Sequence, residues 1–261
     1  MDQNPPTYEP YNSSGTPTPA QGQLVRIQLP KVRPVVAYIL IGFTIAIYLL
    51  QLLSQALLNG NDLLFLWGGK INEFILQGQI WRLITPVFLH ASILHIAFNL
   101  YALFIFGPDL ERAYGHWRFL VLYLLSGFAG NVLSFALSSF DSLGSSTAIF
   151  GLVSAEAVFI YQNRQFFGKR ARSVLINLGI IVAINFALGL TPNSLIDNWG
   201  HLGGLVGGAI FAWLAGPKWL LEGLSPAARI VDQRTNNQVQ VASIVVLILF
   251  GILAWARFIF K

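Results

Sequence analysis

Long stretches without Asp, Glu, Lys or Arg recur along most of this chain. A helix needs about 20 apolar residues to cross the hydrocarbon core of a bilayer. Six stretches reach that length, at 34–61, 83–108, 119–140, 173–196, 198–217 and 235–256, and a seventh at 147–163 is apolar except for Glu156. We therefore expect seven membrane-spanning helices, at 34–58, 91–108, 117–138, 147–163, 172–190, 199–216 and 240–260.

The composition agrees with a membrane environment. Only 10% of the residues are charged, against about 25% in average globular proteins, and the mean hydropathy is +0.62. The chain has no cysteine, which excludes disulfides, thiolate metal sites and a cysteine nucleophile. The expected fold class is an all-α polytopic membrane protein, with no cofactor and no metal.

The basic residues predict an orientation for these helices. Twelve of the 16 Lys and Arg residues fall on one side if the N-terminal segment is cytoplasmic: Arg26, Lys31, Arg33, Arg112, Arg118, Arg164, Lys169, Arg170, Arg172, Lys218, Arg229 and Arg234. By the positive-inside rule, the N-terminus is then cytoplasmic and the C-terminus outside. The net charge of +5 thus reports topology, so we expect the lipid bilayer as a partner and no nucleic acid.

The spans divide the chain into four parts. Residues 1–33 are rich in Pro, Gln, Ser and Thr and predict a disordered cytoplasmic tail. A six-span core at 34–216 and a cytoplasmic linker at 217–239 precede the seventh helix at 240–260. Residues 59–90 contain apolar clusters but no full span, and we expect them to lie outside, in the membrane interface.

Polar groups inside spans are costly and are therefore candidates for function. In the predicted topology, spans 2, 4 and 6 all begin on the outer side, where they bring His90 and His95, Ser145 and Ser146, and His201 to one depth. His116 falls in a cytoplasmic loop and is excluded from this cluster.

Small residues predict how two of these spans pack. Gly200 with Gly204, Gly203 with Gly207, and Gly204 with Gly208 form overlapping small-xxx-small pairs, and span 4 offers Gly151 and Ala155. Close packing of spans 4 and 6 would bring Ser146 and His201 within hydrogen-bond reach, the geometry that activates a serine hydroxyl.

His95 and Asn99 are one helical turn apart and so share a face. Both can donate hydrogen bonds to a developing oxyanion, together with the Ser146 amide at a helix N-terminus. Each signal has a structural reading as well, because a lone histidine is often a structural hydrogen-bonder and a glycine-rich span is most often a packing surface. Their occurrence at one depth, in a chain with so few polar groups inside its spans, favours a site.

Three ordered motifs carry a family resemblance that runs from about Ile80 to Gly216. They read WRLITPVFLHASILHIAFNLYALFIFGPDLERAYG, GSSTAIFG and NWGHLGGLVGG. The chain resembles the rhomboid intramembrane serine proteases, with their H-x-x-x-N span, G-x-S-G nucleophile motif and glycine-rich last core span. The resemblance implies a catalytic dyad of Ser146 and His201, with His95 and Asn99 as oxyanion donors. It also implies a turn at Gly144 before the nucleophile, and a lateral gate formed by the fifth span.

The chain departs from the rhomboid pattern at two positions. Thr147 stands where Gly usually follows the serine, and Gly200 stands where Ala usually precedes the histidine. The second change is small. A β-branched Thr147 beside the nucleophile is expected to affect the local turn and the oxyanion pocket, although its hydroxyl could equally cap the helix.

The remaining polar residues are expected to be structural. We interpret Asp197 as a loop residue rather than a third catalytic acid, and His90 as a cap or loop hydrogen-bonder. Trp81 and Arg82 are assigned to the outer loop by the resemblance, and Glu111 and Arg112 to a cytoplasmic loop. Glu156 lies ten residues after Ser146, about 15 Å deeper, which is too far for a catalytic acid.

The sequence thus predicts a serine endopeptidase that cleaves the transmembrane segments of other membrane proteins, in a bacterial-type cell membrane. Two alternatives stay open. A rhomboid-like protein that binds membrane helices without cutting them would be supported by Thr147 alone. A small-solute transporter would need a polar site at mid-membrane with interrupted spans, whereas the predicted polar cluster lies near one surface.

Overall fold

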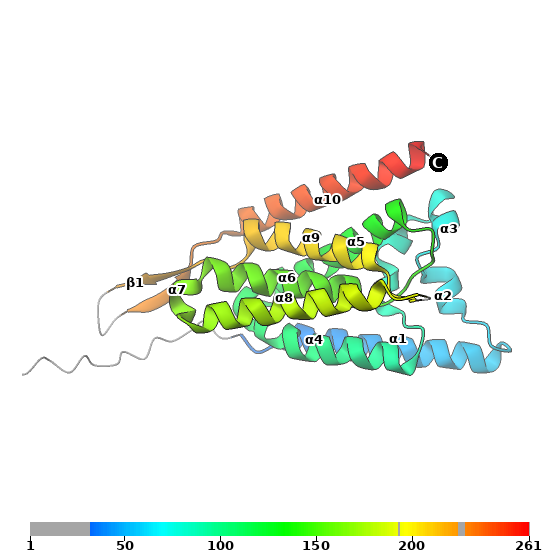
Figure 1. Cartoon of the computed structure of the whole chain (residues 1–261), viewed down its shortest axis with the longest axis horizontal. Coiled ribbons are helices and arrows are strands. Elements are labelled where there is room, and N and C mark those ends of the chain that lie inside the picture. The colour runs from blue at the N-terminus through cyan, green and yellow to red at the C-terminus, as the bar shows by residue number, and fades with distance from the viewer. Residues whose placement is uncertain (1–31, 193, 224–227, 261) are drawn as a thin grey trace, which may run out of the picture.

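The computed structural model describes residues 32–192, 194–223 and 228–260. Most of the predicted tail, residues 1–31, lies outside the described residues. In the described part, seven long helices run along roughly one axis (Figure 1): α1 (Val35–Leu57), α4 (Ile93–Tyr114), α5 (His116–Leu137), α6 (Ser146–Gln162), α8 (Arg170–Gly189), α9 (Asn198–Ala215) and α10 (Asn236–Ile259). Each coincides with one predicted span, and the predicted all-α class is confirmed.

Five of these helices, α1, α4, α5, α8 and α10, are long and apolar enough to cross a membrane by length and composition. Helix α6 is apolar but has only 17 residues. The number of seven crossings therefore stays a prediction, while a multi-pass arrangement is supported.

Helix α6 is the central helix of the bundle. Eleven of its 17 residues are buried, because α4, α5, α8 and α9 all pack against it. Helix α8 is the opposite case, since only Ala171 and Leu178 of its 20 residues are buried. Helix α10 covers α5 and α9, with Phe258 packed against Phe135 at 5.6 Å between ring centroids.

Helix α4 runs past Pro108, where the predicted span ended, to Tyr114. It stops at Gly115, whose φ of 78° lies in a region that glycine adopts easily. The extension carries the buried Glu111, whose carboxylate accepts the N–H groups of Val36 and Ala37 at 2.8 and 2.7 Å. A rule that ends spans at charged residues misses this extension, because the Glu111 carboxylate is buried and caps α1.

Residues 59–92, here called the outer segment after their predicted location, contain no full span, as predicted for residues 59–90. They form α2 (Leu63–Gly68), α3 (Asn72–Leu76) and two 3-10 turns, η1 (Ile80–Leu83) and η2 (Thr85–Phe88). Trp67 and Trp81 stack at 5.7 Å between ring centroids. The buried Arg82 donates to the carbonyl oxygens of Gly69 and Leu66, which makes it a structural residue of the outer segment.

The predicted linker at 217–239 contains a feature that the sequence analysis did not anticipate. Strands β1 (Trp219–Glu222) and β2 (Arg229–Asp232) pair antiparallel, with Trp219 opposite Asp232. Trp219 is buried against aromatic rings of α6 and α7 (Arg164–Phe167). Its amide donates to Asn163 Oδ1 at 2.7 Å, so the hairpin is anchored to the end of α6.

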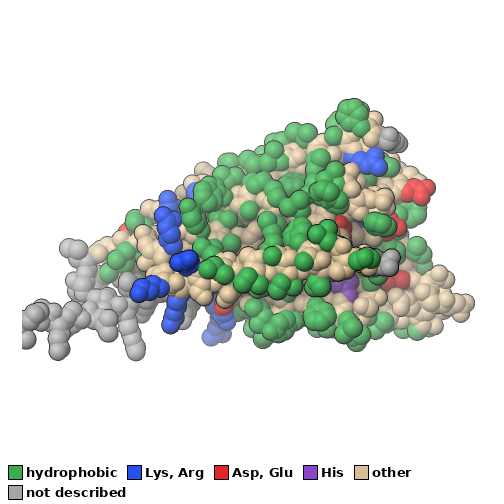
Figure 2. Space-filling view, viewed as in Figure 1, with side chains coloured by type: hydrophobic (Ala, Val, Ile, Leu, Met, Phe, Trp, Pro, Cys, Tyr) green, Lys and Arg blue, Asp and Glu red, His purple; other side chains and the backbone are tan. Residues whose placement is uncertain are grey.

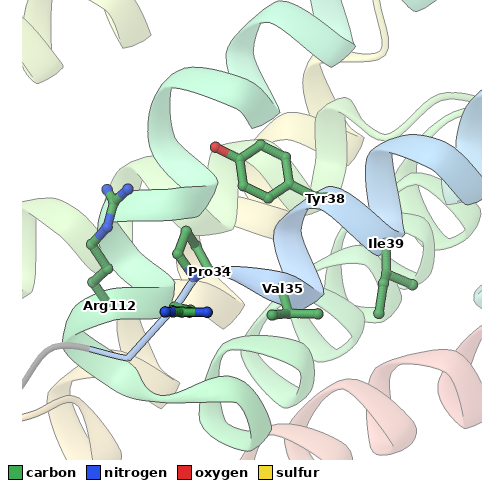
Figure 3. A pocket seen from close by; sticks show the side chains of 6 residues that line it. Pro34, Val35, Tyr38, Ile39 and Arg112 are labelled. Carbon is green, nitrogen blue, oxygen red and sulfur yellow. The ribbon is translucent and has the colours of Figure 1, made fainter.

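Charges are unevenly distributed along the bundle. Most of the visible Lys and Arg side chains gather at the end where α1 begins, whereas the visible histidine lies towards the other end (Figure 2). An open pocket at the basic end is lined by Arg33, Pro34, Val35, Tyr38, Ile39 and Arg112 (Figure 3). Arg112 is in the last turn of α4 and His95 in its first, so this pocket is remote from the predicted polar cluster.

Candidate active site

The three helices that carry the predicted site residues begin at the same end of the bundle (Figure 1). His95 lies in the first turn of α4, Ser146 is the first residue of α6, and His201 lies in the first turn of α9. The structure therefore brings these three residues to the same end of the bundle.

Helices α6 and α9 are in backbone contact. A Cβ atom on Gly204 would lie 1.9 Å from the carbonyl oxygen of Thr147, and one on Gly208 would lie 2.5 Å from the Cα of Gly151. Contacts this short leave no room for a side chain, which explains the predicted role of Gly204 and Gly208.

Two further glycines of the α9 motif, Gly203 and Gly207, face a different neighbour. A Cβ on Gly203 would lie 2.5 Å from the carbonyl oxygen of Ala129 in α5, and one on Gly207 would lie 2.4 Å from the Cβ of Ala129. The glycines of α9 therefore serve two packing surfaces, and α9 is wedged between α5 and α6.

His201 lies against the first turns of α6. Its ring is buried and stacks on Phe150, with 4.1 Å between centroids and 12° between planes. Phe150 follows Ser146 by four residues, so it is one helical turn further along the same face of α6. His201 therefore packs on the face of α6 that begins with Ser146.

The two predicted catalytic side chains, Ser146 and His201, form no hydrogen bond with each other in the described part of the chain. Ser146 is only half-buried, and His201 Nδ1 is buried with no hydrogen-bond partner among the described residues. Hydrogen bonds between catalytic groups are often long in the absence of substrate and tighten in the reacting complex.

Asp197 does not bind the histidine ring. Its Oδ1 accepts the Gly200 amide at 2.9 Å, which caps α9, and its Oδ2 accepts a hydrogen bond from Ser134 at 2.5 Å. The interpretation of Asp197 as a structural loop residue agrees with these contacts.

The predicted oxyanion residues lie beside the turn that precedes the serine. Gly144 has φ of 127°, and a Cβ there would lie 2.6 Å from His95 Nε2 and 3.7 Å from Asn99 Nδ2. The Gly144 amide donates to Pro86 O at 2.9 Å. Glycine is required at this position for both its backbone conformation and the close approach of His95.

Thr147 points away from this turn. A Cβ on Gly130 of α5 would lie 2.5 Å from the Cβ of Thr147, and one on Gly200 would lie 3.0 Å from its Cγ2. The side chain is thus buried between α5 and α9. Its hydroxyl is buried without a hydrogen-bond partner among the described residues, so the alternative that it caps α6 is wrong.

His90 belongs to a buried network behind the serine. Its amide donates to Gln51 Oε1 at 2.9 Å, and its Nε2 lies 3.3 Å from Ser145 Oγ. Burial, with a contribution from the neighbouring His95, lowers the pKa of His90 to about 3. The expectation of a loop hydrogen-bonder fits, but sequence reasoning missed its partner Gln51, whose only signal was a polar residue inside the first span.

The other polar residues lie apart from this cluster. Arg112 pairs with Asp109 at the far end of α4, and Glu156 is partly buried in α6 beyond the first turns. Within the described ranges, no group of three His, Asp or Glu side chains is arranged to hold a metal ion. A serine hydroxyl and imidazole rings are groups that can take part in nucleophilic and acid–base chemistry.

The chain resembles several known proteins over this region. It is 39% identical over 176 residues to "Rhomboid protease GluP" of Bacillus subtilis (strain 168), covering 67% of this chain and 34% of that protein. It is 37% identical over 152 residues to "RHOMBOID-like protein 9, chloroplastic" of Arabidopsis thaliana, covering 58% of this chain and 35% of that protein. The chain thus spans about a third of the length of these two relatives.

The family comparison covers most of the predicted core at 34–216, but not its first span. The Rhomboid domain model matches residues 77–218, more than half of the chain. This range includes part of the outer segment and helices α4 to α9, and it ends before α10. The chain therefore belongs to the rhomboid family and is an integral, multi-pass membrane protein.

Proposed function

We propose that this chain is an intramembrane serine endopeptidase that cleaves transmembrane segments of other membrane proteins. Ser146 is the nucleophile and His201 the general base. His95, Asn99 and the Ser146 amide donate hydrogen bonds to the oxyanion. Gly144, Thr147 and Gly204 shape the site without taking part in the chemistry.

One observation carries this proposal. The contact between Gly204 and the Thr147 carbonyl brings the first turns of α6 and α9 together, and the His201 ring stacks on Phe150. A histidine is thereby held beside the helix turn that begins with a half-exposed serine. The His95 ring lies next to Gly144, which supports its proposed role as a hydrogen-bond donor to the oxyanion.

The reaction follows from these positions. The neutral imidazole of His201 takes the proton of Ser146 Oγ, and this oxygen attacks the scissile carbonyl carbon. The oxyanion of the tetrahedral intermediate accepts hydrogen bonds from His95, Asn99 and the Ser146 amide. By analogy with other serine hydrolases, each such donor increases the rate by about 10² to 10³. The imidazolium then protonates the leaving amine, and water hydrolyses the acyl-enzyme by the reverse sequence of proton transfers.

A helical substrate must open before it can react, because its carbonyl groups are engaged in its own hydrogen bonds. We therefore expect small or helix-breaking residues near the cleaved bond. Helix α8 is the proposed lateral gate. It is mostly exposed, and its Phe186 packs edge-on against Phe150 at 5.8 Å and near His201 at 6.4 Å. Outward movement of α8 would uncover the histidine to a substrate arriving from the lipid.

The orientation is part of the proposal. The N-terminal segment is cytoplasmic and the C-terminus outside, in a bacterial-type cell membrane. The site then opens near the outer leaflet, at the end of the bundle opposite most of the visible basic side chains (Figure 2).

The alternative of a rhomboid-like protein that does not cut rests on Thr147. The packing of its side chain against Gly130 and Gly200, away from Gly144 and His95, supports an undisturbed oxyanion region and so favours the protease.

The test uses the purified full chain in proteoliposomes with a transmembrane reporter and a fluorophosphonate probe. Wild type should cleave the reporter and become labelled, whereas Ser146→Ala and His201→Ala should do neither. Ser145→Ala is the matched control, because Ser145 is adjacent, is buried and lies beside His90. If labelling survives in Ser146→Ala but disappears in Ser145→Ala, the nucleophile is Ser145 and the proposal for Ser146 is wrong.

A further inference from the structure

Lys70 is a buried cation that neither the sequence motifs nor the proposed mechanism uses. It lies in the outer segment between α2 and α3, and it is 0% exposed. An ammonium group is costly to bury unless hydrogen bonds and an opposite charge compensate it. Its surroundings should therefore show what keeps it there.

The backbone of Lys70 binds the segment that leads to the serine. Its amide donates to Ser142 O at 2.9 Å, and its carbonyl accepts the Ser142 amide at 3.0 Å. Its Nζ also donates to Phe140 O at 2.5 Å. Ser142 precedes Ser146 by four residues, so Lys70 holds the approach to α6 through three hydrogen bonds.

The same ammonium group reaches the segment that leads to the histidine. Lys70 Nζ donates to Ser134 Oγ at 3.0 Å, and Ser134 Oγ donates in turn to Asp197 Oδ2 at 2.5 Å. Asp197 accepts the Gly200 amide with its side chain and the His201 amide with its carbonyl oxygen, both at 2.9 Å. Asp197 precedes His201 by four residues and caps α9.

We propose that Lys70 is a positioning residue that sets the distance between Ser146 and His201; this inference rests on the proposed function of these two residues. Lys70 connects the two segments from outside the helix bundle, through Ser142 on one side and through Ser134 and Asp197 on the other. Loss of the ammonium group leaves the buried Ser134 hydroxyl without its donor and the partly buried Asp197 carboxylate without a nearby positive charge. The start of α9 can then shift relative to the start of α6.

The experiment compares Lys70→Met with Ser134→Ala and the double variant, all as full chains in proteoliposomes. Lys169→Met is the matched control, because Lys169 is exposed and undergoes the same chemical change. Reporter cleavage yields kcat and KM, and the rate of fluorophosphonate labelling measures Ser146 reactivity without a substrate helix. Thermal unfolding identifies a temperature at which every variant is folded.

We expect Lys70→Met to lower kcat and the labelling rate together by roughly ten- to a hundredfold, the scale expected for misplacement of reacting groups by about 1 Å. KM should change little, and Lys169→Met should match wild type. Ser134→Ala should lower kcat and the labelling rate as well, although it leaves the hydrogen bond from Lys70 Nζ to Phe140 O in place. The double variant should lose no more than Lys70→Met alone, because both changes cut the same connection from Lys70 to Asp197.

Three outcomes would overturn the inference. The first is a folded Lys70→Met variant whose kcat and labelling rate equal those of wild type. The second is a double variant in which the losses of the two single variants multiply. If Lys70→Met does not fold, Ser134→Ala decides alone, since it leaves Lys70 in place and only severs its link to Asp197; wild-type activity in that variant is the third. These outcomes are distinct from failure of the proposed function, in which wild type itself neither cleaves the reporter nor reacts at Ser146.

Discussion

Thr147 and Gly200 are in contact across the α6–α9 interface: a Cβ atom on Gly200 would lie 3.0 Å from Cγ2 of Thr147. These are the two positions at which the chain departs from the rhomboid pattern. The side chain after the serine is larger than the usual glycine, and the residue before the histidine is smaller than the usual alanine. Volume added on α6 is therefore offset by volume removed from α9, which is the kind of exchange that packed cores tolerate.

This contact predicts that Gly200→Ala is more costly while the Thr147 methyl group is present than after its removal. Overpacking should destabilise the chain by about 1–3 kcal/mol and lower the cleavage rate. In a Thr147→Ser background, which keeps the hydroxyl but removes Cγ2, the cost should be smaller. The measurement is the unfolding free energy in detergent of wild type, Gly200→Ala, Thr147→Ser and the double variant.

The remaining cost in both backgrounds comes from Asp197, whose Oδ2 would lie 2.9 Å from the new Cβ. Gly179→Ala is the control, because nothing lies within 4 Å of a Cβ at that position in α8. An equal cost of Gly200→Ala in both backgrounds would mean that the two departures are independent.

Gly204→Ala should be more severe than Gly200→Ala. Its Cβ would meet a backbone carbonyl oxygen at 1.9 Å, and neither backbone can move aside without separating α6 from α9. We expect a loss of at least about 3 kcal/mol in stability and no detectable cleavage. Thermal unfolding measures the loss of stability. Gly251→Ala on α10 is the control, because nothing lies within 4 Å of a Cβ there. A stable and active Gly204→Ala variant would contradict the close approach of α6 and α9.

Acid should destabilise the chain through His90. Burial, with the contribution of His95, lowers its pKa from the ordinary 6.5 to about 3, so the native state keeps this ring neutral while the unfolded chain takes up a proton. The stabilisation is complete above pH 6.5 and declines as the pH falls from there towards 3, by about 1.4 kcal/mol per pH unit. Unfolding free energies from pH 7 to pH 4 should therefore fall less steeply for His90→Gln than for wild type, and parallel curves would refute this assignment.

The absence of cysteine makes the proposed orientation directly testable. Single cysteines at the exposed positions Gln77, in the outer segment, and Lys169, between α7 and α8, should label oppositely with a membrane-impermeant maleimide. In intact cells Gln77→Cys should react and Lys169→Cys should react only after permeabilisation. The reverse pattern would invert the topology and place the site at the cytoplasmic surface.

The positions of the helices could be predicted because hydropathy is a property of each segment alone. A stretch of 20 residues without charge has few alternatives to a helix in or beside the membrane, and the glycine spacing of α9 already indicated a close neighbour. Glu111 shows where this reasoning fails. The predicted span ended before Asp109, whereas α4 continues through Glu111, whose carboxylate caps a helix 74 residues away in sequence. No local pattern reports such a partner.

The residues of the site could likewise be named from the sequence, whereas the contacts between them could not. Ser146, His201, His95 and Asn99 could be named from spacing and motif, since each lies in the first turns of a helix and helical geometry is local. The contact of Thr147 with Gly200, the binding of Asp197 to Ser134 instead of the histidine, and the burial of Lys70 depend on which helix faces meet. Close packing and the pairing of buried polar groups join residues far apart in the chain, so these relationships exist only in the folded protein.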